Sequence, residues 1–128
     1  MSRTALLVHN PGSGQRRDRF HSVTRMVDAL RLRGITVTPQ VTSGPADATR
    51  LAAAAVQARA DLVIVHGGDG TVNETMQAMV GTPTPLAVWP GGTSNVLARE
   101  LGLPGSLDLL ADVIATGRMR RVSVGRAG

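Results

Sequence analysis

The stretch LVIVHGGDGTVNE, at residues 62–74, joins an apolar run to a cluster of glycines and a polar segment. Residues 62–65 are apolar and mostly β-branched, which is typical of a short buried strand. Three glycines and Asp69 follow at once, and the polar-apolar run after them looks like the start of a helix. Because open α/β sheets bind ligands at the carboxyl ends of their strands, this turn places Asp69 where a ligand is expected.

The glycines of this turn favour an anion site. Gly67, Gly68 and Gly70 have no Cβ atoms, so phosphate oxygens can approach the backbone N–H groups. The N-terminus of a following helix adds a favourable field for negative charge. A plain bend between strand and helix is the alternative, but it does not require the acid, hydroxyl and amide side chains packed around the turn.

Strands and helices alternate along the rest of the chain. Further strands are expected at residues 5–8, 35–42, 86–89 and 118–124, and helices at residues 15–33, 47–59, from about 72 to 80, 93–101 and from about 107 to 116. Pro39 lies inside the second strand, which should therefore be an edge strand or be broken there. The alternation predicts an α/β fold with a mostly parallel sheet.

Apolar residues at helical spacing predict which helix faces are buried. Gly34 and Gly117 are expected to end the first and last helices, and the methionines are interpreted as core filler. The predicted core positions of the helices are Phe20, Val23, Val27, Leu30, Leu51, Val56, Val72, Met76, Met79, Val80, Leu107, Leu110 and Ile114.

The composition narrows the class of protein. With 128 residues, 42% hydrophobic and 18% charged, the chain fits one globular domain. One Phe, one Trp and no Tyr argue against a module that stacks nucleic-acid bases, so no nucleic-acid partner is expected. No Cys is present, which excludes disulfides and thiolate zinc sites. No run approaches the length of a membrane span and no signal peptide is evident, so we expect a cytoplasmic protein.

Three loops follow strands and should meet at one edge of the sheet: residues 10–14, 67–74 and 91–95. Their glycine, hydroxyl and amide groups suit a polyphosphate and a magnesium ion, with phosphoryl transfer driven by positioning and charge neutralisation. Asp69, the acid at the centre, could deprotonate an acceptor hydroxyl or organise the metal. Glu74 could support the site or be a first-turn acid favoured by the helix dipole. His66 and Trp89 are interpreted as structural, and the sequence identifies no metal ligands.

These loops resemble those of a known family. Residues 67–71, GGDGT, match the motif of the diacylglycerol kinase superfamily, which NAD kinases share and phosphofructokinases carry in variant form. The continuation VNE, the stretch NPGSG at residues 10–14 and PGGTSNVLAR at residues 90–99 are similar to the lipid-kinase branch. Val96 departs from the pattern, because many members have Asp there. The chain thus resembles the diacylglycerol kinase catalytic-domain family of bacterial lipid kinases, related to sphingosine kinases and NAD kinases.

The resemblance implies a Rossmann-like, mostly parallel sheet with helices on both faces, as in the N-terminal domain of NAD kinases and diacylglycerol kinases. It implies that residues 1–128 are the nucleotide-binding domain, and that the β-rich C-terminal lipid-binding domain usual in the family is absent from this chain. It favours Asp69 as the catalytic base. The nucleotide-binding residues carried over are Asn10, Pro11, Gly12, Ser13, Gly14, Thr42, Gly67, Gly68, Asp69, Gly70, Thr71, Asn73, Glu74, Gly92, Thr93 and Asn95.

The function so implied is that of a lipid kinase domain. It would use ATP and Mg²⁺ to phosphorylate a lipid hydroxyl such as that of diacylglycerol, at the inner face of the membrane, in phospholipid biosynthesis. The alternatives are a non-catalytic nucleotide-binding or regulatory module and an NAD kinase-like enzyme. The sequence names neither the lipid nor the oligomeric state, and a homo-oligomer stays open.

Overall fold

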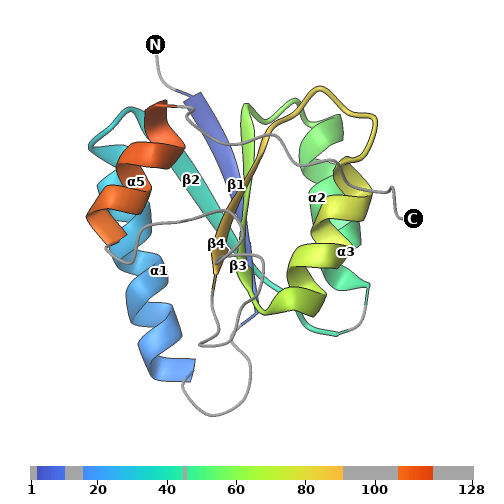
Figure 1. The fold of residues 1–128 in the computed structure, drawn as a ribbon, viewed down its shortest axis with the longest axis horizontal. Coiled ribbons are helices and arrows are strands. Elements are labelled where there is room, and N and C mark those ends of the chain that lie inside the picture. Colours follow the sequence, from blue (N-terminus) through green and yellow to red (C-terminus); the bar gives the residue numbers. More distant parts are fainter. Residues whose placement is uncertain (1–2, 11–15, 45, 91–106, 117–128) are drawn as a thin grey trace.

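The fold is a four-stranded parallel sheet between two layers of helices (Figure 1). The computed structural model describes residues 3–10, 16–44, 46–90 and 107–116, with the side chains of residues 16–20 and 90 left out. The elements are β1 (Arg3–His9), α1 (Arg16–Arg31), β2 (Ile35–Val41), α2 (Asp47–Gln57), β3 (Leu62–Gly67), α3 (Asp69–Met79), β4 (Leu86–Pro90) and α5 (Leu107–Thr116). The expected helix at 93–101 and the strand at 118–124 lie outside the described residues.

The sheet has the strand order β2-β1-β3-β4, and all three neighbouring pairs are parallel. β3 is central and buried on both faces, which explains the apolar run LVIV with which it begins. β2 is an edge strand, as Pro39 predicts, and it is not broken there, because Pro39 keeps its register opposite Leu7 of β1. The α/β fold with helices on both faces is therefore confirmed.

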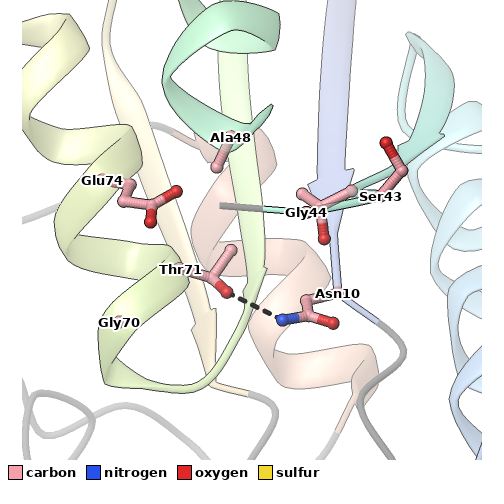
Figure 2. A pocket seen from close by; sticks show the side chains of 8 residues that line it. Asn10, Ser43, Gly44, Ala48, Gly70, Thr71 and Glu74 are labelled. Carbon is pink, nitrogen blue, oxygen red and sulfur yellow. Dashed lines mark hydrogen bonds between the residues drawn. The ribbon is translucent and has the colours of Figure 1, made fainter. Parts of the chain in front are cut away.

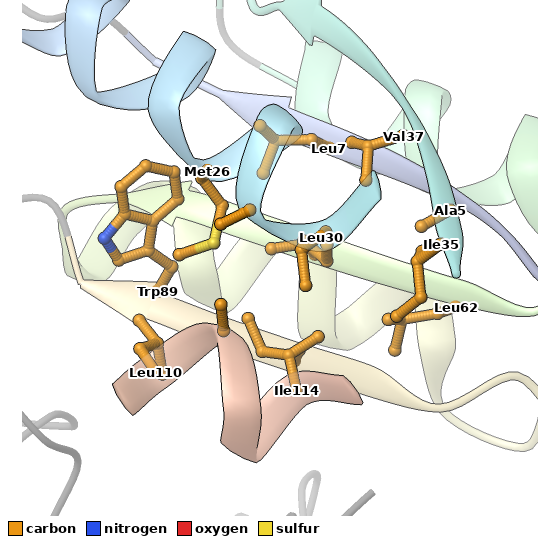
Figure 3. Packing of buried hydrophobic residues seen from close by; sticks show 14 of the residues in the cluster. Ala5, Leu7, Met26, Leu30, Ile35, Val37, Leu62, Trp89, Leu110 and Ile114 are labelled. Atoms are coloured by element: carbon orange, nitrogen blue, oxygen red, sulfur yellow. The ribbon is translucent and has the colours of Figure 1, made fainter. Parts of the chain in front are cut away.

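One layer consists of α1 and α5 (Figure 1). Val23 and Leu30 face the sheet as predicted, and the fully buried Met26 lies between them as a core residue that the spacing did not include. Leu110 and Ile114 of α5 complete this core beside Trp89 (Figure 3). α1 is followed by Gly34 with φ +86°, the left-handed conformation that favours glycine after a helix. Gly117 lies outside the described residues.

The other layer consists of α2 and α3. Small residues of α2 (Ala48, Ala52 and Ala55) are buried, so this helix lies close to the sheet. In α3 the predicted positions Val72 and Met79 are buried and Met76 packs against them.

The prediction for Val80 is wrong. Its side chain is 54% exposed, because α3 ends at Met79 and the backbone of Val80 is extended. The fully buried fourth position is Thr75 instead, whose hydroxyl donates a hydrogen bond to the Thr71 carbonyl oxygen at 2.9 Å. That intrahelical bond lets a polar side chain occupy the core.

Candidate functional site

Backbone hydrogen bonds join the carboxyl ends of three neighbouring strands. The Thr42 backbone N–H donates to the His9 carbonyl oxygen at 2.9 Å, and the Asn10 N–H donates to the His66 carbonyl oxygen at 3.1 Å. The chain therefore leaves β2, β1 and β3 side by side, as the sequence predicts for loops that follow parallel strands.

A side-chain hydrogen bond joins the first two predicted loops. Asn10 Nδ2 donates to Thr71 Oγ1 at 3.2 Å, across 61 positions of sequence (Figure 2). Asn10 follows β1 directly, whereas Thr71 belongs to the first turn of α3. The predicted meeting of these two loops is confirmed, while residues 11–14 and 91–95, with Pro11, Gly12, Ser13, Gly14, Gly92, Thr93 and Asn95, lie outside the described residues.

A cavity of about 500 Å³ opens beside this hydrogen bond. It is bounded by the ends of β1 and β2 and by the first turns of α2 and α3 (Figure 2). Its lining residues are Asn10, Thr42, Ser43, Gly44, Ala48, Gly70, Thr71 and Glu74. The structure thus brings together five of the residues carried over from the family resemblance.

Ser43, Gly44 and Ala48 line the cavity without having been identified from the sequence. Ser43 and Gly44 directly follow the predicted contact residue Thr42, and Ala48 has no polar group that would mark it. The sequence features that could have indicated these three residues are their proximity to Thr42 and their small size. Small side chains at this corner leave the space that the cavity occupies.

The predicted phosphate loop at residues 67–74 is mostly helix. α3 begins at Asp69, directly after its N-cap Gly68, and the Val72 N–H donates to the Gly68 carbonyl oxygen at 3.0 Å. The amides of a first helical turn have no acceptor within the helix, so this N-terminus still offers N–H donors. The anion-binding property expected of a loop is therefore supplied by a helix N-terminus.

The three glycines of the motif differ in what surrounds them. A Cβ atom on Gly67 would lie 3.0 Å from Thr71 Cβ, whereas Gly68 and Gly70 have no heavy atom within 4 Å of that position. Gly67 is buried at the end of β3, while Gly68 and Gly70 are exposed. Gly67 is therefore required by packing within the protein, and only Gly68 and Gly70 keep space open toward solvent.

The acids of the motif occupy different places. Glu74 is half-buried and its carboxylate lies toward the cavity (Figure 2). Asp69 is exposed in the first turn of α3 and does not line the cavity. Gly68 and Asn73 are also exposed, and neither lines the cavity. The sequence placed all four in one site, whereas the structure separates an inner acid from an outer one.

Asp47 stabilises the segment between β2 and α2 that lines the cavity. Its Oδ2 accepts hydrogen bonds from the Ser43 backbone N–H at 2.8 Å and from Ser43 Oγ at 3.0 Å, and its Oδ1 accepts from Arg50 Nε at 3.0 Å. The Ser43 N–H and then Arg50 hold the pKa of the Asp47 carboxyl below its usual value. The carboxylate therefore fixes Ser43 and Gly44 where they line the cavity.

The cavity and the acids near it can be compared with what ATP and magnesium require. A polar cavity of about 500 Å³ at the carboxyl ends of the strands fits a nucleoside. Within the described residues no group of three His, Cys, Asp or Glu side chains could hold a metal ion. Magnesium commonly binds through one or two carboxylates together with substrate phosphates, so the single exposed Asp69 fits that mode.

The chain is similar to known proteins over nearly its whole length. A family model described as diacylglycerol kinase catalytic domain matches residues 4–127. The diacylglycerol kinase of Mycobacterium tuberculosis is 41% identical over 98 residues, which are 76% of this chain and 32% of that protein. The diacylglycerol kinase of Bacillus subtilis is 34% identical over 127 residues, which are 95% of this chain and 41% of that protein.

A solved structure shows the same fold. The crystal structure of a diacylglycerol kinase from Bacillus anthracis superimposes with a TM-score of 0.73 at 31% identity, and covers 89% of this chain and 42% of that one. The chain thus spans between 32% and 42% of the length of these relatives.

Proposed function

The chain belongs to the diacylglycerol kinase catalytic-domain family, and on this premise we propose that residues 1–128 are the nucleotide-binding domain of an ATP-dependent lipid kinase. The observation that carries the proposal is the cavity that the Asn10–Thr71 hydrogen bond borders. It lies beside the carboxyl ends of β1 and β2 and the first turn of α3, next to the point between β1 and β3 where the order β2-β1-β3-β4 reverses direction. Such a switch point is where open parallel sheets bind nucleotides.

The two acids orient the nucleotide in this proposal. The Glu74 carboxylate lies toward the cavity, where it would repel phosphate and accept hydrogen bonds from the hydroxyl or amino groups of a nucleoside. The nucleoside therefore occupies the cavity, with Thr42 and Asn10 as further polar partners. The phosphates extend toward the N-terminus of α3, where Gly68 and Gly70 leave room beside the backbone N–H donors.

Asp69 acts at the phosphate end. Its exposed position in the first turn of α3 lets it reach the outer phosphates, or the hydroxyl that attacks them, without entering the cavity. A magnesium ion bound with the phosphates would neutralise their charge. Asp69 then either takes the proton of the acceptor hydroxyl or holds the metal directly or through water.

The acceptor is a lipid hydroxyl such as that of diacylglycerol, because the relatives are named diacylglycerol kinases. A lipid acceptor places the working protein at a membrane surface, and use of ATP places it on the cytoplasmic side. Within the described residues no helix has the length and apolar character to cross a bilayer. The contact with lipid is therefore proposed as peripheral, with the remaining length of such kinases supplying the lipid site.

Calorimetric titration of the chain with ATP, with and without Mg²⁺, tests the proposal. If Asp69 holds the metal, Asp69→Asn should lower the affinity for MgATP at least fivefold and leave the affinity for ATP without metal nearly unchanged. Asp108→Asn is the matched control, because Asp108 is an exposed acid in the first turn of α5 as Asp69 is in α3. Equal effects of the two substitutions on the affinity for MgATP would exclude the metal role of Asp69 and leave only its role as the base or as an acid that favours the helix dipole.

A second titration tests the orientation. Glu74→Gln should change the affinities for adenosine and for ATP by the same factor, because the residue meets the nucleoside, whereas Asp69→Asn should leave the affinity for adenosine unchanged. Absence of nucleotide binding by the folded chain would refute the proposal. The chain could also bind MgATP but phosphorylate no lipid, even after addition of the part of a related diacylglycerol kinase that this chain does not span. That result would favour a non-catalytic nucleotide-binding module.

A further inference from the structure

The face of the sheet opposite the cavity carries a row of ring side chains at the carboxyl ends of three strands. His9 of β1 is in register with His66 of β3, and His66 is in register with Trp89 of β4. All three are buried, with exposed fractions of 2%, 5% and 8%. Residues in register on adjacent strands lie on the same face, so the row belongs to the layer of α1 and α5, where Trp89 closes the end of the core (Figure 3).

His66 makes two different contacts with Trp89. The two rings stack with centroids 3.6 Å apart and planes 17° apart. His66 Nδ1 also lies 3.0 Å from the Trp89 carbonyl oxygen. A carbonyl oxygen can only accept, so Nδ1 carries the proton and donates this hydrogen bond. The stack and the hydrogen bond together fix both the indole and the backbone at the end of β4.

The backbone of His66 connects the row to the first strand. Its carbonyl oxygen accepts the Asn10 N–H at 3.1 Å, and Asn10 in turn bonds Thr71 at the cavity. His66 therefore contacts the ends of β1 and β4 at once. It also directly precedes the GGDGT motif in sequence.

We propose that His66 is a positioning residue that fixes where the chain leaves β4 relative to the first turn of α3. Burial alone would be served by an apolar side chain, as at Ile64, which faces the same layer two residues earlier. What the imidazole adds is a donor for the Trp89 carbonyl, two residues before the glycines of the third predicted loop. Its importance for nucleotide binding rests on the proposed function, whereas its effect on β4 does not.

Two substitutions separate the two contacts. His66→Phe keeps a ring for stacking but removes the donor, so the Trp89 carbonyl oxygen loses its partner on this side chain. His66→Asn loses the ring but keeps a donor, because Asn Nδ2 is attached to Cγ as His Nδ1 is. Ile64→Val is the control, since it removes one methylene from the same face of β3 at a position in register with Ala87, where His66 is in register with Trp89.

Amide hydrogen exchange measures the effect on β4 without any ligand. In His66→Phe the amide exchange of residues 86–89 should accelerate about tenfold more than that of the rest of the sheet, as expected when one hydrogen bond is lost and its buried acceptor keeps no partner on this side chain. His66→Asn should restore most of that protection, and Ile64→Val should accelerate all strands evenly. Trp89 is the only tryptophan and no tyrosine is present, so emission reports this ring alone and should change in His66→Asn, where the stack is lost.

Calorimetry measures the consequence for the ligand. MgATP should bind five- to tenfold more weakly to His66→Phe than to the wild-type chain, and within about twofold of wild type to His66→Asn and Ile64→Val. The proposal is overturned if His66→Phe exchanges and binds like wild type, or if Ile64→Val weakens binding as much as His66→Phe. If the wild-type chain binds no MgATP, the proposed function fails, and the exchange of β4 still decides whether His66 positions this strand.

Discussion

Replacing Gly67 by Ala should destabilise the fold, although Gly67 belongs to a motif that suggests phosphate binding. An added Cβ would lie 3.0 Å from Thr71 Cβ and 3.3 Å from both Thr71 Cγ2 and Oγ1, closer than ordinary contacts. Thr71 cannot move aside freely, because its Oγ1 accepts from Asn10 and its carbonyl oxygen accepts from Thr75. Overpacking of this kind typically costs about 1–3 kcal/mol.

That cost corresponds to a fall in Tm of roughly 4–12 °C, at about 4 °C per kcal/mol for a domain of this size. Thermal and urea unfolding followed by circular dichroism would measure it. Gly70→Ala is the control within the same motif, in the first turn of α3, because a Cβ there meets no heavy atom within 4 Å. It should leave the fold unchanged or stabilise it by about 0.5–1 kcal/mol, as alanine does inside a helix. The packing argument is refuted if Gly67→Ala melts like wild type, or if Gly70→Ala is the more destabilised of the two.

Two further predictions concern pH. Burial lowers the pKa of His9, so the unfolded chain takes up a proton first as the pH falls, and the stability present above pH 6.5 should decline as the pH falls through the depressed folded pKa. In His9→Leu the urea midpoints at pH 7.5 and 5.5 should therefore differ less than they do in wild type. In the exposed control His21→Leu they should differ as much as in wild type. Asp47→Asn should destabilise the chain at neutral pH, and the difference from wild type should shrink as the pH falls below 3.8 through the lowered pKa of Asp47. Asp28→Asn, which affects only an exposed pair with Arg31 on α1, should have little effect at either pH.

Much of the fold could be predicted because local patterns match the layers they occupy. The apolar run at the start of β3 indicates a strand buried on both faces, and Pro39 indicates an edge strand, which are the positions that both occupy. The errors arise where tertiary structure intervenes. Spacing alone extends the face of α3 to Val80, but the helix ends one residue earlier. Thr75 was not predicted in the core, because its polarity is compensated by a bond inside the helix.

The site could be predicted only in part, because its cavity is formed by segments distant in sequence. The GGDGT motif and Asn10 indicate an anion site at the sheet edge, and the structure places Gly70, Thr71 and Asn10 together there. The size of the cavity depends on Ser43 and Gly44, whose position is fixed by hydrogen bonds to Asp47. Neither their distance from Glu74 nor the space between them can be inferred from periodicity.

The pleat of the strands also explains why the same edge carries two kinds of residue. His9 faces the layer of α1 and α5, and the next residue, Asn10, reaches Thr71 in the layer of α2 and α3. His66 likewise contacts Trp89 on one face, while the chain after Gly67 turns into α3 on the other. Successive residues at a strand end therefore serve opposite faces. Substitutions in the ring row should act by moving the loops, whereas substitution of Glu74 should act by removing a contact to the proposed ligand. The two classes should differ in hydrogen exchange of the unliganded chain, because only the first changes the sheet itself.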